Sequence, residues 1–322
     1  PLTLSPIVES HPLNISRETF TGSTRRVKAV NLALAPGARG ALLLLHGTGG
    51  SAAFADQIEA RALMIEAHAR GLTVIVPEAE EAVAGDLDGN GKRRWDPDLL
   101  AGNVDLANLD RLLADLEARG RIPACGPRYV IGMSNGGVMA IALGAVAADR
   151  ALAARFPELV FDGATSYCAP GSAIAAATTR TRSAWRMCEN DTNESVGEGG
   201  AEEAESYASI LRARGVPSEV TVHAASPLYD QRFERIGLDA ATSAAIAGEL
   251  RAAGFVDARD FFVVTTDEML AEVQAEPTAF PRLMSITDRQ RKDVANQLNV
   301  MTADHDMYSD ANARTLDFLG VR

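Results

Sequence analysis

The chain has 322 residues and a net charge of −12, and 47% of its residues are hydrophobic. This length suffices for one large α/β domain with an insertion, or for two ordinary domains. The acidic balance, without any basic tract, argues against binding to nucleic acid phosphates and favours neutral or weakly polar substrates. No apolar run reaches the roughly twenty residues that a membrane span needs.

In the first two thirds of the sequence, expected strands alternate with expected helices. Residues 1–23 read as polar and irregular. Strands are expected at residues 25–37, 40–47, 72–79, 128–133, 162–171, 183–191 and 218–225, and helices at 54–71, 100–120, 136–156 and 199–215. This alternation predicts a doubly wound, mostly parallel α/β sheet.

The alternation stops after Ala225. Residues 226–300 read as mostly helical, with expected helices at 238–254, 266–274 and 286–298. We therefore expect a core in residues 1–225, a helical insertion in 226–300, and a return to the core in 301–322 with a closing helix. The insertion is expected to be a cap or lid over the active-site rim, with an oligomerisation interface as the alternative.

Ser134 lies between two glycines where an expected strand turns into an expected helix. A serine hydroxyl needs a base to accept its proton and donors to stabilise the oxyanion that forms after attack. A sharp strand-to-helix turn exposes the side chain, and the small Gly132 and Gly136 let the two sides of the turn approach closely. The Gly-x-Ser-x-Gly pattern in this context predicts that Ser134 is a nucleophile.

The oxyanion hole is expected to combine two backbone N–H groups. The run 42–50 ends a buried strand upstream of the nucleophile, where an oxyanion-binding loop is expected. We predict that Thr48 and Asn135 donate these N–H groups. His46, in the same run, is expected to orient the loop rather than to act as the base.

The base should follow the last strand, and His305 lies in a polar turn just before the closing helix. The acid that orients the histidine should follow a late strand, which favours Asp191, with Glu189 as the nearest alternative. Asp304 and Asp306 flank His305 too closely to orient its ring, so we expect them to be surface charges.

These segments resemble the polyhydroxybutyrate depolymerase and feruloyl esterase group of the α/β-hydrolase superfamily. The resemblance lies in "GMSNGGVMA", in the upstream "LLHG", in "NVDLANLDRLLADL" and in the loop after "AWRMCEND". It implies an α/β-hydrolase fold, Ser134 as nucleophile, Asp191 as acid and His305 as base, and Thr48 and Asn135 as oxyanion donors.

The resemblance implies a serine carboxylic-ester hydrolase that needs no cofactor and acts on small or oligomeric esters of hydroxyalkanoate or feruloyl type, or on polyester. Many members have cysteine where this chain has Thr48, and they lack so long an insertion before the histidine. A roofed cleft would suit small or soluble esters. The alternatives are a serine peptidase or amidase with the same triad, and a binding protein without catalytic activity on the same fold.

An acidic stretch suggests a structural Ca²⁺ site. Asp86, Asp88 and Asn90 supply oxygen atoms at every second position, followed by a turn glycine, and Asp96 or Asp98 would complete the ligand shell. The glutamate that closes an EF-hand loop is absent. An Asx-rich surface turn explains the same pattern, and both interpretations stay open.

Trp95 follows this stretch directly. We expect it either to line the substrate cleft, as a substrate-binding residue, or to pack within the core.

The sequence contains three cysteines, of which Cys168 and Cys188 follow neighbouring expected strands. A single bridge between them and two buried free thiols are equally compatible with the sequence. The sequence starts at Pro1 rather than at methionine. We expect N-terminal trimming, which favours a secreted or periplasmic protein over a cytoplasmic one.

Overall fold

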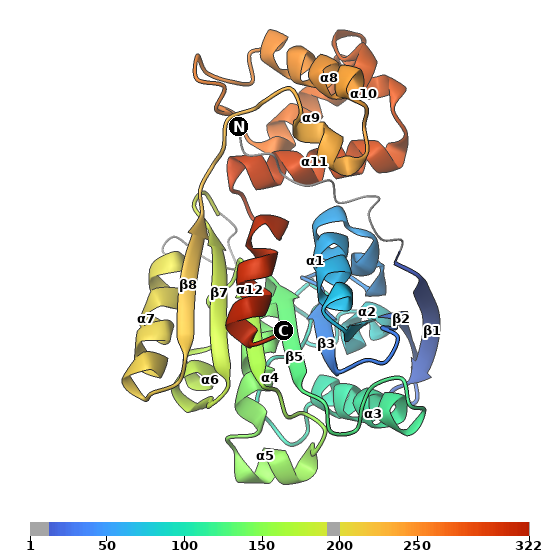
Figure 1. Ribbon diagram of the computed structural model, residues 1–322, viewed down its shortest axis with the longest axis vertical. Helices are drawn as coiled ribbons and strands as arrows, with labels where there is room; N and C mark the ends of the chain where they lie inside the picture. The colour runs from blue at the N-terminus through green and yellow to red at the C-terminus, as the bar shows by residue number, and fades with distance from the viewer. Residues whose placement is uncertain (1–12, 192–199, 322) are drawn as a thin grey trace.

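The computed structural model describes residues 13–191 and 200–321. Within these residues, eight strands form one sheet in the order β1-β2-β4-β3-β5-β6-β7-β8 (Figure 1). The strands are Ile15–Thr21 (β1), Val27–Ala33 (β2), Gly40–Leu45 (β3), Leu72–Pro77 (β4), Arg128–Met133 (β5), Gly163–Tyr167 (β6), Arg182–Cys188 (β7) and Ser218–His223 (β8). Strand β2 is antiparallel to both of its neighbours, β1 and β4, and the other pairs are parallel. This is the α/β-hydrolase sheet, and the predicted fold class is confirmed.

Strand β1 lies in the stretch that the sequence led us to expect as irregular. Residues 16–19 of this strand carry polar or charged side chains, and only Phe20 is buried. The strand forms one edge of the sheet, and most of its side chains remain in contact with water. The hydrophobic alternation that marks a strand is therefore missing from this segment.

Helices cover both faces of the sheet. One face packs against Ile58–Ala69 (α1) and Asn312–Leu319 (α12), and the other packs against Val104–Ala118 (α3), Asn135–Val146 (α4) and Gly200–Ala213 (α7). Shorter helices are Ala52–Asp56 (η1), Glu80–Ala84 (α2), Arg150–Arg155 (α5), Ala173–Thr178 (α6) and Ser309–Ala311 (η4). The single helix expected over 136–156 is two helices, because the Asp149 side chain accepts the N–H groups of Ala151 and Leu152 and starts α5.

Burial explains the parallel order of the central strands. All six residues of β3 and all six of β4 are buried, because helices cover both faces of the sheet at these strands. The carboxyl ends of the parallel strands lie along one edge. The loops that follow β3, β5 and β7 therefore meet there, and these loops carry the predicted site residues.

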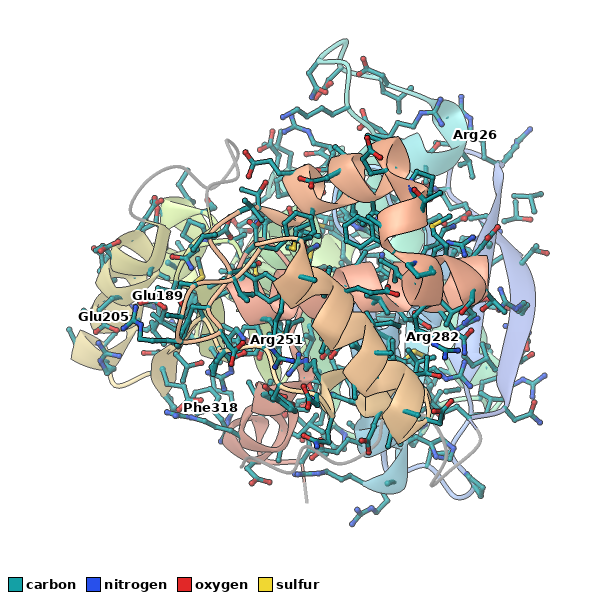
Figure 2. The ribbon with its side chains drawn as sticks, turned by 90° about the horizontal axis from the view of Figure 1, so that it is seen from above. Arg26, Glu189, Glu205, Arg251, Arg282 and Phe318 are labelled. Atoms are coloured by element: carbon teal, nitrogen blue, oxygen red, sulfur yellow. The ribbon has the colours of Figure 1, made fainter. Side chains whose placement is uncertain are left out.

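The insertion gathers above this edge of the sheet (Figure 1). Its helices are Arg232–Ile236 (η2), Ala240–Ala252 (α8), Thr266–Ala275 (α9), Pro277–Ala279 (η3), Pro281–Ser285 (α10) and Asp288–Thr302 (α11). Seen from above, the insertion lies in front of the sheet, and Arg251 and Arg282 mark two of its helices (Figure 2). The insertion has its own hydrophobic core, which reaches the main domain at Ile58 of α1.

A buried polar contact also joins the insertion to the main domain. The Glu59 carboxylate of α1 accepts a hydrogen bond of 2.6 Å from the Gln297 Nε2 of α11, and both side chains are buried. Within the described residues, no helix is both long enough and apolar enough to cross a bilayer.

Candidate active site

Ser134 occupies a strained turn between β5 and α4. Its backbone angles are φ 56° and ψ −126°, a conformation that residues other than glycine rarely adopt. Such strain costs about 1–3 kcal/mol and persists only where the surroundings enforce it. Here the Ser134 N–H donates to Tyr167 O at 2.8 Å, and the Ser134 carbonyl accepts from the N–H groups of Gly137 and Val138. The turn is therefore held from both sides.

The two flanking glycines sit where side chains would collide with backbone. A Cβ on Gly132 would lie 2.0 Å from Gly136 O, and a Cβ on Gly136 would lie 2.4 Å from His46 O. A Cβ on Gly47 would lie 3.2 Å from the Ser134 Cβ, so the loop after β3 runs directly beside the serine. The close approach inferred from the sequence is the reason for these glycines.

His305 and Asp191 form a direct pair. His305 Nδ1 lies 2.9 and 2.8 Å from the two carboxylate oxygens of Asp191. The Asp191 side chain is 4% exposed and that of His305 is 14% exposed. Among the described residues, the buried His305 Nε2 has no hydrogen-bond partner, so the Ser134 hydroxyl does not hydrogen-bond to it in this structure. Nucleophile–base hydrogen bonds are often long in ligand-free enzymes and shorten in the complex with substrate.

The alternative acid lies elsewhere. Glu189 is exposed, and its carboxylate accepts the N–H of Ala225 at 3.1 Å. It is not the partner of His305, whereas Asp191 is. The contact with His305 Nδ1 therefore distinguishes two carboxylates that are only two residues apart in the sequence.

The side chain of Asn135 connects the nucleophile turn to the loop before α3. Its Oδ1 accepts from Trp95 N at 2.7 Å, and its Nδ2 donates to Trp95 O at 3.2 Å. The Asn135 N–H belongs to the first residue of α4 and so has no acceptor within the helix. Thr48 is exposed at the turn after β3. It follows Gly47, which lies beside Ser134, and the role of Thr48 and Asn135 as oxyanion donors stays a prediction.

Trp95 lies in the core, which is the second of the two positions that the sequence left open. Its side chain is fully buried, and its Nε1 donates to His46 O at 2.9 Å. The indole also packs against the His46 ring at a centroid distance of 5.0 Å. Trp95 supports the loop after β3 from beneath.

His46 orients this same loop. Its Nδ1 donates to Gly47 O at 2.7 Å, and its Nε2 accepts the Ala79 N–H at 3.2 Å. These two bonds require the neutral ring. Burial lowers the pKa of His46 to about 4, so the ring stays neutral at physiological pH.

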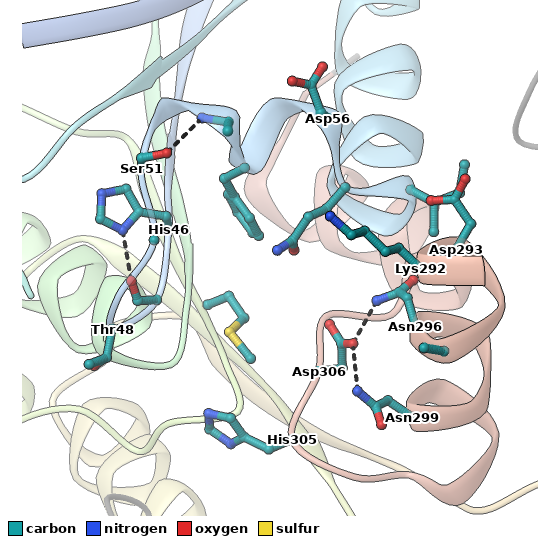
Figure 3. Close-up of a pocket in the computed structure, with 18 of the residues that line it drawn as sticks. His46, Thr48, Ser51, Asp56, Lys292, Asp293, Asn296, Asn299, His305 and Asp306 are labelled. Atoms are coloured by element: carbon teal, nitrogen blue, oxygen red, sulfur yellow. Dashed lines mark hydrogen bonds between the residues drawn. The ribbon is translucent and has the colours of Figure 1, made fainter. Parts of the chain in front are cut away.

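A cavity of about 820 Å³ opens beside these loops, within the size range of small-molecule sites (Figure 3). On the core side its lining includes Gly47, Thr48, Met133 and His305. Helix α11 of the insertion forms the opposite wall, with Arg289, Lys292, Asp293, Ala295, Asn296 and Asn299. The insertion thus contributes directly to the cavity that contains His305.

Asp304 and Asp306 are not the free surface charges that the sequence led us to expect. Asp304 Oδ1 accepts the His305 N–H at 2.7 Å. Asp306 Oδ2 accepts from Asn296 Nδ2 at 2.6 Å and from Asn299 Nδ2 at 3.3 Å. Burial raises the pKa of Asp306 to about 7, although the hydrogen bonds from Asn299 and the backbone oppose the shift. Sequence reasoning missed Asn296 and Asn299, whose only signal was their i, i+3 spacing on one helix face.

The acidic stretch forms an Asx-rich turn. Asp86 accepts the N–H groups of Gly89, Asn90 and Gly91, and the Asp88 carboxylate pairs with Arg94 at 3.1 Å. This arginine is the main cause that lowers the Asp88 pKa. Glu81 lies close to Asp86 and Asp88. Their carboxylate oxygens lie within 4.8 Å of one another, and a structural Ca²⁺ at this turn stays a prediction.

Cys168 and Cys188 are buried free thiols with their sulfur atoms 3.4 Å apart. The Cys168 thiol donates to Asp306 O at 3.0 Å. Of the two interpretations of these residues, the structure has the unbridged pair, and it lies beneath the His305 turn.

No family model and no curated protein matches this chain. The solved structures that it resembles include a dienelactone hydrolase from Anabaena variabilis, which is 17% identical, with 66% of this chain and 87% of that chain covered and a TM-score of 0.46. The poly(3-hydroxybutyrate) depolymerase LpqC from Bordetella parapertussis is 14% identical, with coverage of 77% and 93% and a TM-score of 0.43. The α/β serine hydrolase XC6422 from Xanthomonas campestris, described as lacking a lid, is 12% identical, with coverage of 67% and 86% and a TM-score of 0.41.

The fold of the present chain does not rest on these likenesses. Its α/β-hydrolase fold follows from its own strand order and from the helices that connect the parallel strands.

Proposed function

We propose that this protein is a serine hydrolase that cleaves carboxylic esters through an acyl-enzyme intermediate. The contact between His305 Nδ1 and the Asp191 carboxylate, at 2.8 Å beside a cavity, carries the proposal. A carboxylate there holds the imidazole in one tautomer and stabilises the imidazolium that forms during the reaction. The strained turn of Ser134, which directly follows the cavity-lining Met133, supports its assignment as the nucleophile.

In the proposed reaction, Ser134 Oγ attacks the ester carbonyl carbon while His305 Nε2 accepts the hydroxyl proton. The N–H groups of Thr48 and Asn135 stabilise the tetrahedral oxyanion. His305 then gives the proton to the leaving alcohol. Water attacks the acyl-enzyme by the same sequence in reverse, releasing the acid and free Ser134. Each step is a proton or acyl transfer, and the proposal assigns no step to a metal or an organic cofactor.

The substrates proposed are small or oligomeric esters of hydroxyalkanoate or feruloyl type. Two features support this size class. Helix α11 closes one side of the cavity, and the cavity has the volume of a small-molecule site. A flat polymer surface would have to approach past the insertion.

A fluorophosphonate probe and a panel of esters test the proposal. We expect stoichiometric labelling at Ser134 and turnover of short p-nitrophenyl esters, with both lost in Ser134→Ala while the circular dichroism spectrum is unchanged. Ser172→Ala is the matched control, because this hydroxyl lies outside the turn between β5 and α4 and makes no capping bond to α6. A folded wild-type protein that is neither labelled nor active would refute the proposal and favour a binding protein. Faster turnover of matched amides than of esters would favour the peptidase alternative.

A further inference from the structure

The residue after His305 is tied to the insertion by its side chain. Asp306 accepts the Asn296 amide at 2.6 Å and the Asn299 amide at 3.3 Å, as the dashed lines in Figure 3 show. Its other carboxylate oxygen accepts the Met307 N–H at 2.7 Å. Three donors thus converge on one carboxyl group in the cavity wall. These hydrogen bonds restrain the rotation of the side chain, because another orientation would break them.

The main chain of Asp306 is held as well. Its carbonyl accepts the Cys168 thiol at 3.0 Å. Since Cys168 directly follows β6, the turn that carries His305 is fastened to the sheet on one side and to α11 on the other. The two attachments together limit how far the imidazole can move.

The same helix also holds the loop of the acid. The Asn190 N–H donates to Ala303 O at 3.0 Å, and Asn190 Nδ2 donates to Thr302 O at 2.8 Å. Asn190 directly precedes Asp191. The carboxyl end of α11 therefore binds the neighbour of Asp191, while Asn296 and Asn299 bind the neighbour of His305.

Helix α11 is itself anchored in the main domain. Besides the buried contact between Gln297 and Glu59, His223 Nε2 lies 2.8 Å from Val300 O, and the Ser226 N–H donates to Met301 O at 2.9 Å. These contacts reach α1 and the end of β8. A helix fixed at several points can hold two loops at a constant separation.

We propose that Asp306 is a positioning residue for His305. The Asn296 and Asn299 amides of α11 hold Asp306, and in this way the insertion sets the geometry of the His305–Asp191 pair. This inference rests on the proposed function. It assigns the end of the insertion a part in catalysis that a cap or lid would not have.

An exchange of the two polar partners tests the proposal. Asp306→Asn replaces one of the two acceptor oxygens by an NH2 group, which then faces a donor, either the Met307 N–H or the asparagine amides. Asn296→Asp sets two carboxylates against each other. The double variant restores a donor and an acceptor between positions 296 and 306 with the direction reversed. A misplacement of about 1 Å can cost on the order of 100-fold in rate. We expect each single variant to lower kcat for p-nitrophenyl acetate by about 10- to 100-fold with little change in KM. The double variant should regain most of the loss.

Asp288→Asn is the matched control. It makes the same chemical change as Asp306→Asn, but Asp288 lies at the far end of α11, where it pairs with Arg291. It should leave kcat unchanged. Thermal melts of all variants identify any general loss of stability. Single variants with wild-type kcat would overturn the proposal, and so would a double variant as slow as the slower single one.

A second readout does not depend on turnover. The proton on His305 Nδ1, hydrogen-bonded to Asp191, should give a low-field proton resonance, which is assigned by its absence in His305→Ala. We expect Asp306→Asn to weaken or shift this resonance and the double variant to restore it. An unchanged resonance in Asp306→Asn would overturn the positioning role. If the wild type hydrolyses no ester, the proposed function fails, and the resonance still tests the role of Asp306.

Discussion

Replacing Gly132 by alanine should distort the turn of the proposed nucleophile. The added Cβ would lie 2.0 Å from Gly136 O and 2.2 Å from Gly136 C, whereas real Cβ atoms stay beyond 3.0 Å. Both contacts are with backbone, so no side-chain rotation relieves them, and the turn must open by about 1 Å. Overpacking of this kind costs about 1–3 kcal/mol of folding stability. A 1 Å displacement at a reacting group lowers turnover on the order of 100-fold.

Gly248→Ala provides the contrast, because this glycine lies within α8 and its added Cβ would meet nothing within 4 Å. Alanine there should stabilise the protein by about 0.5–1 kcal/mol. Urea unfolding gives the two free energies, and turnover of p-nitrophenyl acetate gives the activity. The argument from backbone contact is refuted if Gly132→Ala unfolds at the wild-type midpoint and keeps near wild-type turnover.

Three further outcomes are expected. Asp191→Asn should lower kcat by roughly 10⁴-fold, because the carboxylate that orients the histidine is lost, while Glu189→Gln should change kcat little. Equal effects of the two variants on kcat would contradict the assignment of Asp191 as the acid. Trp95→Phe should cost about 1–3 kcal/mol in urea unfolding, because the buried His46 carbonyl loses its 2.9 Å donor; an unchanged midpoint would count against this role. The pKa of His46 falls from 6.5 to about 4 in the folded protein because of burial, so only the unfolded chain gains a proton between these values. The contribution of His46 to stability should therefore be full above pH 6.5 and fall by up to about 3 kcal/mol as the pH drops to 4. It is obtained as the difference between the wild type and His46→Gln when unfolding is measured across this range.

The sequence alone predicted most of the sheet and the turn of Ser134. Continuous apolar runs such as residues 40–45 mark strands buried on both faces, and this signal is local. The glycines around Ser134 mark a close approach within five residues of chain. The missed strand, β1, lacks such a signal because its side chains face water at an edge.

The environment of the predicted site followed only from the tertiary structure. Trp95 and Asp306 have no local pattern that distinguishes a core position from a surface one, and the fold placed both beside the loops of the site. Glu59 and Gln297 are 238 residues apart, yet they share a buried hydrogen bond that holds the insertion on the main domain. Such contacts depend on how whole helices pack, whereas periodicity and turn chemistry report only on neighbours along the chain.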